Sequence, residues 1–385
     1  MKRRTILVLV ITLFLLFLAI LVFLTLYRPH RPGNSNFTNV SPIRAVRVDY
    51  LNFLDSRGEV DTLETRMQQA GVNTVALSAG RADWTYFPWP HHPDRWAAEV
   101  KTSGVDYLME DSVRFSRWAH VSAVVDILSP VYIQSHPESA AITWDGTPSK
   151  DLVGTMELVD GQFGQNLLSM INEIATYYPV NSITITELVY YVDGYGIQDK
   201  KAYLAYTNRI DWPRMANGQI NIDDPSIGTW RSYEINRFLE KAAEIIHKHG
   251  KLLFVEARVS TNADGSVTLQ NGTNLDELLK YADQLIVWGN PNPEGNTPST
   301  FGAVARLLAL YGPGRTIPMI GLWDKSYDYL IPKDQISAIP ATDFQTAIQS
   351  ATQNGATDLW IEPSFLMSDS HWQVLKEAWK TGSPP

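Results

Sequence analysis

The clearest strand signal in this chain is Val180-Asn181-Ser182-Ile183-Thr184-Ile185-Thr186-Glu187. A short β-branched block of this kind is typical of a parallel strand that is buried on both faces of its sheet. The block ends at a carboxylate, Glu187, and opens into the aromatic segment 188–195. In α/β barrels the chemistry lies at the carboxyl ends of the strands. We therefore expect a barrel strand here, with functional residues at its end.

Seven similar blocks occur elsewhere in the chain, and each is followed by a segment with helical periodicity. The strands are expected at 43–50, 72–78, 121–127, 180–187, 251–259, 284–289, 316–323 and 357–362. The helices are expected at 60–70, 107–118, 165–177, 229–249, 275–281, 301–311, 342–354 and 370–379. Eight strand–helix units predict an α/β fold, a (β/α)₈ TIM barrel over residues 43–385. Three long βα loops are expected at 81–94, 129–154 and 188–228.

The composition excludes several classes of function. Hydrophobic residues make up 44% of the 385 and charged residues 19%, which is a globular profile. A net charge of -9 disfavours nucleic acid as a partner, because phosphate backbones require clustered Lys and Arg. Without cysteine there is no disulfide and no thiolate metal site. His91, His92 and His136 lack the spacing of metal ligands, and no nucleotide-binding motif occurs, so we predict no metal and no cofactor.

The amino terminus predicts a membrane anchor. Lys2-Arg3-Arg4 precedes an uncharged run, 6–27, long enough to span the ~30 Å hydrocarbon core as a helix. A cleaved secretory signal is the alternative, but its apolar region would be shorter and would end at a small-residue cleavage site. We expect residues 1–28 to form a single-pass anchor and 29–42 a linker. The positive residues before the run favour a barrel on the extracytoplasmic side.

Polar and aromatic residues at the predicted strand ends and in the loops are the candidates for function. Cleavage of a glycosidic bond usually requires two carboxyl groups, one protonated and one charged. Glu187 fits the general acid, with Asp324 or Glu256 as the second carboxylate. Residues expected to bind substrate are Asp49, Arg81, Trp89, Asp126, Tyr190, Arg258, Trp288, Asn290, Trp323 and Glu362.

Strand parity bears on three of these positions. Glu256 and Arg258 share parity with Leu252 and Phe254, so both are expected to point into the barrel. They form either a structural salt bridge or an electrostatic element that tunes a neighbouring acid. Glu187, in contrast, follows Thr186 and would face outward unless the strand ends or bulges there.

Several segments together resemble the glycoside-hydrolase-like family 10 barrels, a group similar to the C-terminal hydrolase domain of the enzyme that processes bacterial poly-N-acetylglucosamine. They are His136-Pro137-Glu138, Asp145-Gly146, the helix 166–178 and the strand 180–187. The family's fourth strand typically reads Val-Asp-Gly-Ile-x-Phe-Asp-Asp. Thr186 stands in place of its first terminal Asp and Glu187 in place of the second, while Asn181 replaces the earlier Asp.

The resemblance implies a glycoside-hydrolase-like protein that acts on cell-surface or exopolysaccharide glycans, and the N-terminal run adds a membrane anchor with the barrel facing outward. Its expected partners are a polysaccharide or oligosaccharide, and the membrane through the N-terminal helix. Because Thr186 replaces an acidic residue, two alternatives stay open: a non-catalytic glycan-binding barrel and an envelope assembly protein.

Overall fold

The computed structural model describes residues 42–49, 57–261, 267–269, 274–289, 297–298, 301–312, 314–324 and 336–380. The anchor predicted over residues 1–28 and nearly all of the linker 29–42 lie outside these ranges. Within them, no helix is both long enough and apolar enough to cross a membrane.

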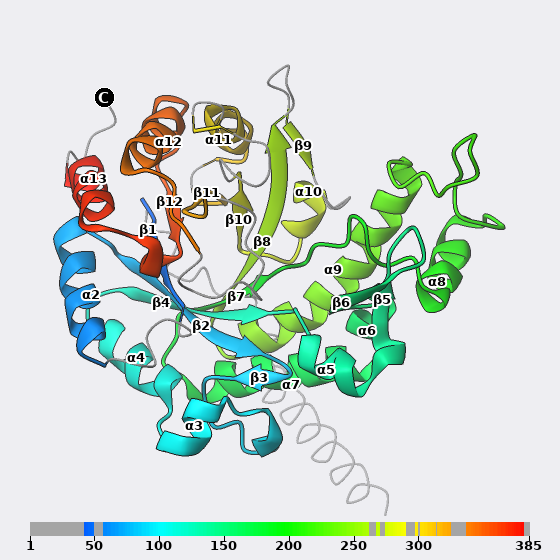
Figure 1. The fold of residues 1–385 in the computed structure, drawn as a ribbon, viewed down its shortest axis with the longest axis horizontal. Coiled ribbons are helices and arrows are strands. Elements are labelled where there is room, and N and C mark those ends of the chain that lie inside the picture. Colours follow the sequence, from blue (N-terminus) through cyan, green and yellow to red (C-terminus); the bar gives the residue numbers. More distant parts are fainter. Residues whose placement is uncertain are drawn as a thin grey trace, which may run out of the picture. The chain divides into compact units, whose positions relative to one another are not determined.

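Eight parallel strands form a closed barrel (Figure 1). They are β1 (Arg44–Val48), β2 (Thr74–Arg81), β4 (His120–Asp126), β7 (Ser182–Thr186), β8 (Leu252–Thr261), β10 (Gln284–Trp288), β11 (Thr316–Gly321) and β12 (Leu359–Glu362). Each strand pairs with its neighbours along the chain, and β1 closes the barrel by pairing with both β2 and β12. The prediction of a (β/α)₈ barrel is confirmed.

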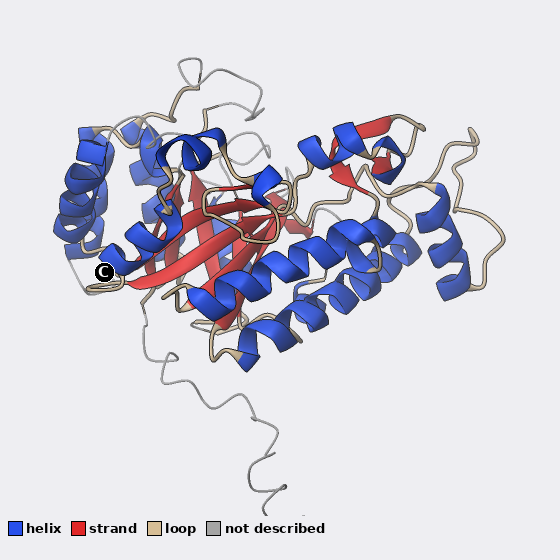
Figure 2. Ribbon diagram, turned by 90° about the horizontal axis from the view of Figure 1, so that it is seen from below, coloured by secondary structure: helices blue, strands red, loops and turns tan. Residues whose placement is uncertain are grey.

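Helices surround the strands, as Figure 2 shows from below. The helices that follow the eight strands are α2 (Arg57–Ala70), α4 (Tyr107–Phe115), α7 (Gln162–Tyr177), α9 (Pro225–Lys248), α10 (Leu275–Leu278), α11 (Phe301–Ala309), α12 (Ala341–Gln353) and α13 (Asp369–Lys380). The main core fills the layer between strands and helices, with Val46, Ile183 and Ile185 among its fully buried members. Alternate strand residues point to this layer and into the barrel, as the two-residue period of a strand requires.

The barrel interior is divided into an apolar side and a polar side. Phe254, Ile286, Met319 and Trp360 are among the residues that form the apolar side. On the other side, neighbouring strands are joined by hydrogen bonds between polar side chains. Ser122 Oγ lies 2.8 Å from Thr184 Oγ1, and His120 Nε2 lies 2.9 Å from Ser182 Oγ. The alternation of Ser and Thr in β7 therefore reflects an inward face that is hydrogen-bonded.

The long βα loops contain short elements that the sequence does not reveal, because segments of three to six residues are too short to show periodicity. The loop after β2 contains β3 (Trp84–Thr85) and α3 (Ala98–Ser103). The loop after β4 contains α5 (Pro130–Ser135), a hairpin of β5 (Ala140–Ile142) and β6 (Pro148–Val153), and then α6 (Thr155–Val159). The loop after β7 contains α8 (Ile197–Thr207), and β9 (Val267–Leu269) pairs with β8.

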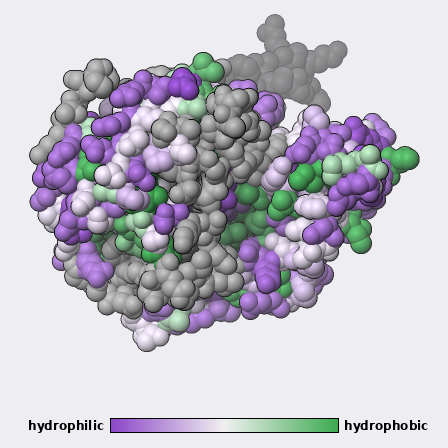
Figure 3. Space-filling model, turned by 45° about the horizontal axis from the view of Figure 1, so that its top comes forward, coloured by the Kyte–Doolittle hydropathy of each residue, from purple (hydrophilic) through white to green (hydrophobic). Residues whose placement is uncertain are grey.

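Two of these insertions build a side lobe, which we define as β5, β6, α6, α8, residues 208–224 and the first turns of α9. It has an aromatic core of its own, in which Tyr203 and Trp212 stack with ring centroids 4.2 Å apart and Trp230 is fully buried. Figure 3 shows apolar residues on the lobe and in the hollow beside it, and Ile197 and Ile210 of the lobe are 86% and 96% exposed.

Candidate active site

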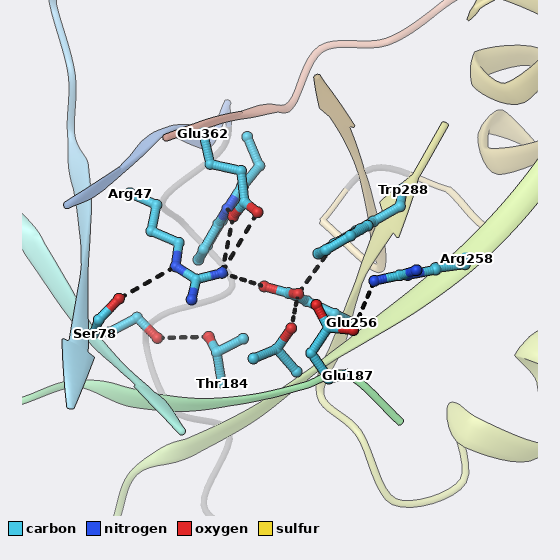
Figure 4. Close-up of polar contacts among 11 residues, drawn as sticks. Arg47, Ser78, Thr184, Glu187, Glu256, Arg258, Trp288 and Glu362 are labelled. Carbon is cyan, nitrogen blue, oxygen red and sulfur yellow. Dashed lines mark hydrogen bonds and ion pairs between the residues drawn. The ribbon is translucent and has the colours of Figure 1, made fainter. Parts of the chain in front are cut away.

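Charged side chains from five strands converge at the carboxyl end of the barrel, and Figure 4 labels all of them except Asp126. They are Arg47, Asp126, Glu187, Glu256, Arg258 and Glu362. Five of the six were candidates in the sequence, and Arg47 was not. Its position could have been inferred, because it has the parity of Ile43 and Ala45, which face the interior.

Glu187 joins this cluster through an unusual backbone conformation. The strand β7 ends at Thr186, and Glu187 takes a φ of +66°, in the left-handed region. Residues other than glycine rarely adopt it, at a cost of ~1–2 kcal/mol. The turn brings the Glu187 carboxylate to the inward-facing Arg258, whose Nη2 donates to Oε2 at 2.6 Å. Because the strand ends at Thr186, the Glu187 side chain reaches the barrel mouth, although strand alternation alone would point it outward.

Glu256 is the most strongly perturbed carboxyl group of the cluster. It is 5% exposed, and its Oε2 accepts hydrogen bonds from the Thr186 hydroxyl and from Trp288 Nε1, the latter at 3.0 Å. Burial, together with the nearby charge of Glu362, raises the pKa of Glu256 to about 8. Glu256 is therefore protonated at neutral pH.

Arg47 lies between two of these carboxyl groups. Its Nη1 is 3.4 Å from both Glu362 oxygens and 3.9 Å from Glu256 Oε1, and its Nε donates to Ser78 Oγ at 3.4 Å. Glu362 is fully buried and also accepts from Trp360 Nε1 at 3.0 Å. Burial raises the pKa of Glu362 above its usual range, and Arg47 opposes this shift. One cation therefore compensates two buried carboxyl groups.

Asp126 lies at the end of β4 and remains partly exposed. Its Oδ1 accepts from the backbone N–H of Leu128 at 2.7 Å. Burial and the charge of Glu187 raise the pKa of Asp126 to about 7, against the opposing charge of Arg81. The barrel mouth thus contains a carboxyl group that binds a proton near neutral pH and is still accessible from solvent.

An aromatic wall adjoins the carboxylates. The Arg258 guanidinium lies 4.2 Å from the centre of the Trp288 ring, a cation–π contact. Trp288 and Trp323 stack with centroids 6.1 Å apart and planes at 29°. Arg81, at the end of β2, pairs with Asp83 at 3.0 Å and lies over Trp84. Flat rings beside charged groups are typical of pockets that orient a polar ligand.

The remaining predicted residues have different positions. Asp324 follows β11, where its backbone N–H donates to Ser337 O at 2.9 Å and its Oδ2 accepts from Ser337 Oγ at 3.3 Å. Asp49 follows β1, one position past its end, and Asn290 lies outside the described residues. The side chains of Trp89 and Tyr190 are fully buried, and the substrate-binding roles expected for them stay predictions.

The fold is shared with solved glycoside hydrolases. The glycoside hydrolase domain of PgaB (BpsB) from Bordetella bronchiseptica matches with a TM-score of 0.61 at 14% identity, over 88% of this chain and 99% of its own. The catalytic domain of β-amylase from Paenibacillus polymyxa gives 0.57 at 11%, over 89% and 100%. A β-galactosidase from Rahnella sp. R3 gives 0.61 at 10%, over 90% of this chain and 57% of its own.

At these identities the likenesses show the shared (β/α)₈ barrel fold, which the sequence predicts. No protein-family model matches the sequence, and no curated protein matches it.

Proposed function

We propose that this protein is a glycoside hydrolase that cleaves glycans by carboxylate acid/base catalysis at the barrel mouth. One observation carries the proposal: two carboxyl groups lie at the same mouth in opposite electrostatic surroundings. Glu187 is ion-paired with Arg258 at 2.6 Å, whereas the pKa of Asp126 is raised to about 7. Titratable groups whose surroundings favour different protonation states are typical acid and base partners.

In this proposal Asp126 is the general acid and Glu187 the charged partner. Asp126 donates its proton to the glycosidic oxygen as the bond to the anomeric carbon breaks. Glu187 either attacks that carbon or removes a proton from the attacking water, according to the separation of the two carboxyl groups. These roles reverse the expectation from the sequence, in which Glu187 is the acid. The reason is Arg258, whose Nη2 donates to the Glu187 carboxylate at 2.6 Å and holds it as the ion-paired partner.

The buried carboxyl groups support these residues from below. Glu256 accepts from Thr186, the residue before Glu187, and from Trp288, the ring under Arg258. It therefore positions both members of the Glu187–Arg258 ion pair. Because Glu256 and Glu362 are at most 5% exposed, we assign them to positioning and not to contact with substrate.

Hydrolysis of a glycan panel by the wild type and by Glu187→Gln, Asp126→Asn and Asp324→Asn tests the assignment. We expect a loss of about 10²–10⁴-fold in the first two variants, the usual contribution of a general acid or base. Asp324→Asn is the matched control, because it removes another carboxylate that follows a barrel strand. A comparable loss of activity in this variant would assign the role of second carboxyl group to Asp324. Binding of glycan by the wild type without any turnover would favour the non-catalytic glycan-binding barrel instead.

We further propose that the natural substrate is a cell-surface or exopolysaccharide glycan, reached by a barrel on the extracytoplasmic side of a membrane. The support is the apolar run 6–27 behind Lys2-Arg3-Arg4. Fractionation of cells that express the full chain, followed by protease treatment of intact cells or spheroplasts, is the test. Recovery of the chain in the soluble fraction, or protection of the barrel from protease, would contradict it.

A further inference from the structure

A second cavity lies outside the barrel, away from the carboxylate cluster. It has a volume of about 780 Å³ and is lined by residues of α8, α9 and the region around α10. Figure 1 shows α9 between α8 and α10, and α9 packs against both. The size is in the range of small-molecule sites, which are concave and combine rings with a few polar groups.

Two tyrosines form an exposed aromatic pair in this cavity. Tyr206 of α8 and Tyr233 of α9 have ring centroids 4.9 Å apart and planes inclined at 31°. They are 41% and 48% exposed. Exposed rings supply a flat, rigid surface at low conformational cost, which suits the C–H-rich face of a sugar ring.

Asn236 supplies a polar group with unused hydrogen-bonding capacity. Its side chain lines the cavity, is 7% exposed, and donates from Nδ2 to Glu277 Oε2 at 3.4 Å. Its Oδ1 is buried and has no hydrogen-bond partner among the described residues. A buried acceptor without a partner costs ~1–3 kcal/mol, so such a group usually accepts from a water or a ligand.

The charges around the cavity argue against an anionic ligand, because its cations are paired and Glu240 adds a carboxylate to the lining. Arg237 is paired with Glu234 at 2.6 Å and with Asp160 at 2.8 Å. Lys280 is paired with Glu277 at 2.6 Å. Since both cations already have carboxylate partners, no excess of positive charge remains for a phosphate or a polyanion. The rings and the amide instead match a neutral, polyhydroxylated molecule.

We propose that this cavity is an accessory saccharide-binding site, which holds one or two neutral sugar units of a glycan on Tyr206 and Tyr233. Asn236 accepts a hydrogen bond from a hydroxyl or acetamido N–H of the bound sugar. The ligand class rests on the proposed glycoside hydrolase function, and the site would hold a glycan chain apart from the carboxylates that cleave it.

Retention on insoluble chitin, curdlan and cellulose, three neutral polysaccharides, tests the site. The probe protein is the full chain with Glu187→Gln, which prevents turnover during binding. We expect it to bind at least one of the polymers, and Tyr206→Ala/Tyr233→Ala in the same background to bind that polymer at least tenfold more weakly. Tyr206→Phe/Tyr233→Phe keeps both rings and should bind within threefold of the parent.

Tyr177→Ala is the matched control, because Tyr177 is 64% exposed on α7 and does not line the cavity. Equal retention of the double alanine variant and its parent would overturn the site. A loss in Tyr177→Ala as large as in the double alanine variant would overturn it too. So would a failure of the parent to bind any of the three polymers. Hydrolysis by the wild type is measured in parallel. If the wild type hydrolyses none of the polymers, the proposed catalytic function is wrong. The binding comparison would still show whether the accessory site exists.

Discussion

The barrel mouth and the side lobe each bury an arginine among carboxyl groups, and the two arrangements differ in what surrounds the acids. At the mouth, Arg47 faces Glu256 and Glu362. In the lobe, Arg231 is 1% exposed, donates to the backbone oxygen of Asp193 at 3.0 Å and lies near Asp199. Burial raises the pKa of Asp199 to about 6, but that of Glu256 to about 8.

The hydrogen-bond donors to each carboxyl group explain the difference between the pKa values of Asp199 and Glu256. Asp199 accepts from the backbone N–H groups of Met156, at 2.9 Å, and Gly196, which favour its charged form. Among the described residues, Glu256 accepts only from the side chains of Thr186 and Trp288, and it has carboxylate neighbours besides Arg47. Carboxyl groups held by backbone amides belong to a structural network, whereas those crowded by like charges are typical of functional sites. Four substitutions test this comparison.

Arg47→Met should have the largest effect. It leaves Glu256 and Glu362 buried without a cation, and breaking a buried pair costs about 3–5 kcal/mol. The loss should be greater at pH 8.5 than at pH 5.5, because the raised pKa of Glu256, about 8, means that this carboxyl group is charged only at the higher pH. Urea unfolding at the two pH values measures it. Arg66→Met, which removes an exposed pair with Asp369, is the control and should cost under about 1 kcal/mol.

Arg258→Met should lower kcat/KM by about 10²-fold, because Glu187 loses the cation that holds its carboxylate in place. The free energy of unfolding should change by less than about 1 kcal/mol, since the pair is partly exposed. Steady-state kinetics on the hydrolysed glycan provides the measurement, and Arg258→Lys should recover part of the loss. Full activity of Arg258→Met would remove Arg258 from the site.

Glu256→Gln should change how stability depends on pH. The raised pKa of Glu256 means that the folded state retains a proton that the unfolded state has released, so its contribution to stability falls as pH rises from about 4.5 to about 8. The variant should lose this dependence, so its free energy of unfolding should rise relative to that of the wild type between pH 4.5 and pH 8.5. Thermal unfolding across this range gives the comparison, and parallel curves for the two proteins would refute the assigned pKa shift.

Asp199→Asn should have the smallest effect, about 1 kcal/mol of stability, because the amide oxygen still accepts from the same backbone groups. Hydrolysis of a short soluble glycoside should be unchanged. Denaturant unfolding and kcat, measured on one preparation, check both outcomes. A tenfold fall in kcat would show that Asp199 affects the barrel mouth. The side-lobe carboxyl group could then no longer be called purely structural.

The barrel was predictable because its buried strands and amphipathic helices carry local periodicity. The convergence of Glu187, Glu256 and Arg258 followed from the rule that strand ends meet at one face. Arg47 was missed because a charged residue inside a strand reads as exposed unless the parity of its neighbours is used. The burial of Trp89 and Tyr190 was not readable, because it depends on how loops fold back over the barrel, and a loop sequence has no period.

The helix α9 has 24 residues, about 36 Å at the usual rise. Its first half contributes Trp230 to the lobe core and Tyr233 to the outer cavity, and its second half packs against β8, the strand that carries Glu256 and Arg258. The helix α9 therefore connects the proposed accessory site to the barrel strand β8. The length of α9 thus sets the distance between the proposed accessory site and the barrel mouth. A glycan that occupies both must have a minimum number of sugar units, and shorter chains can fill only one.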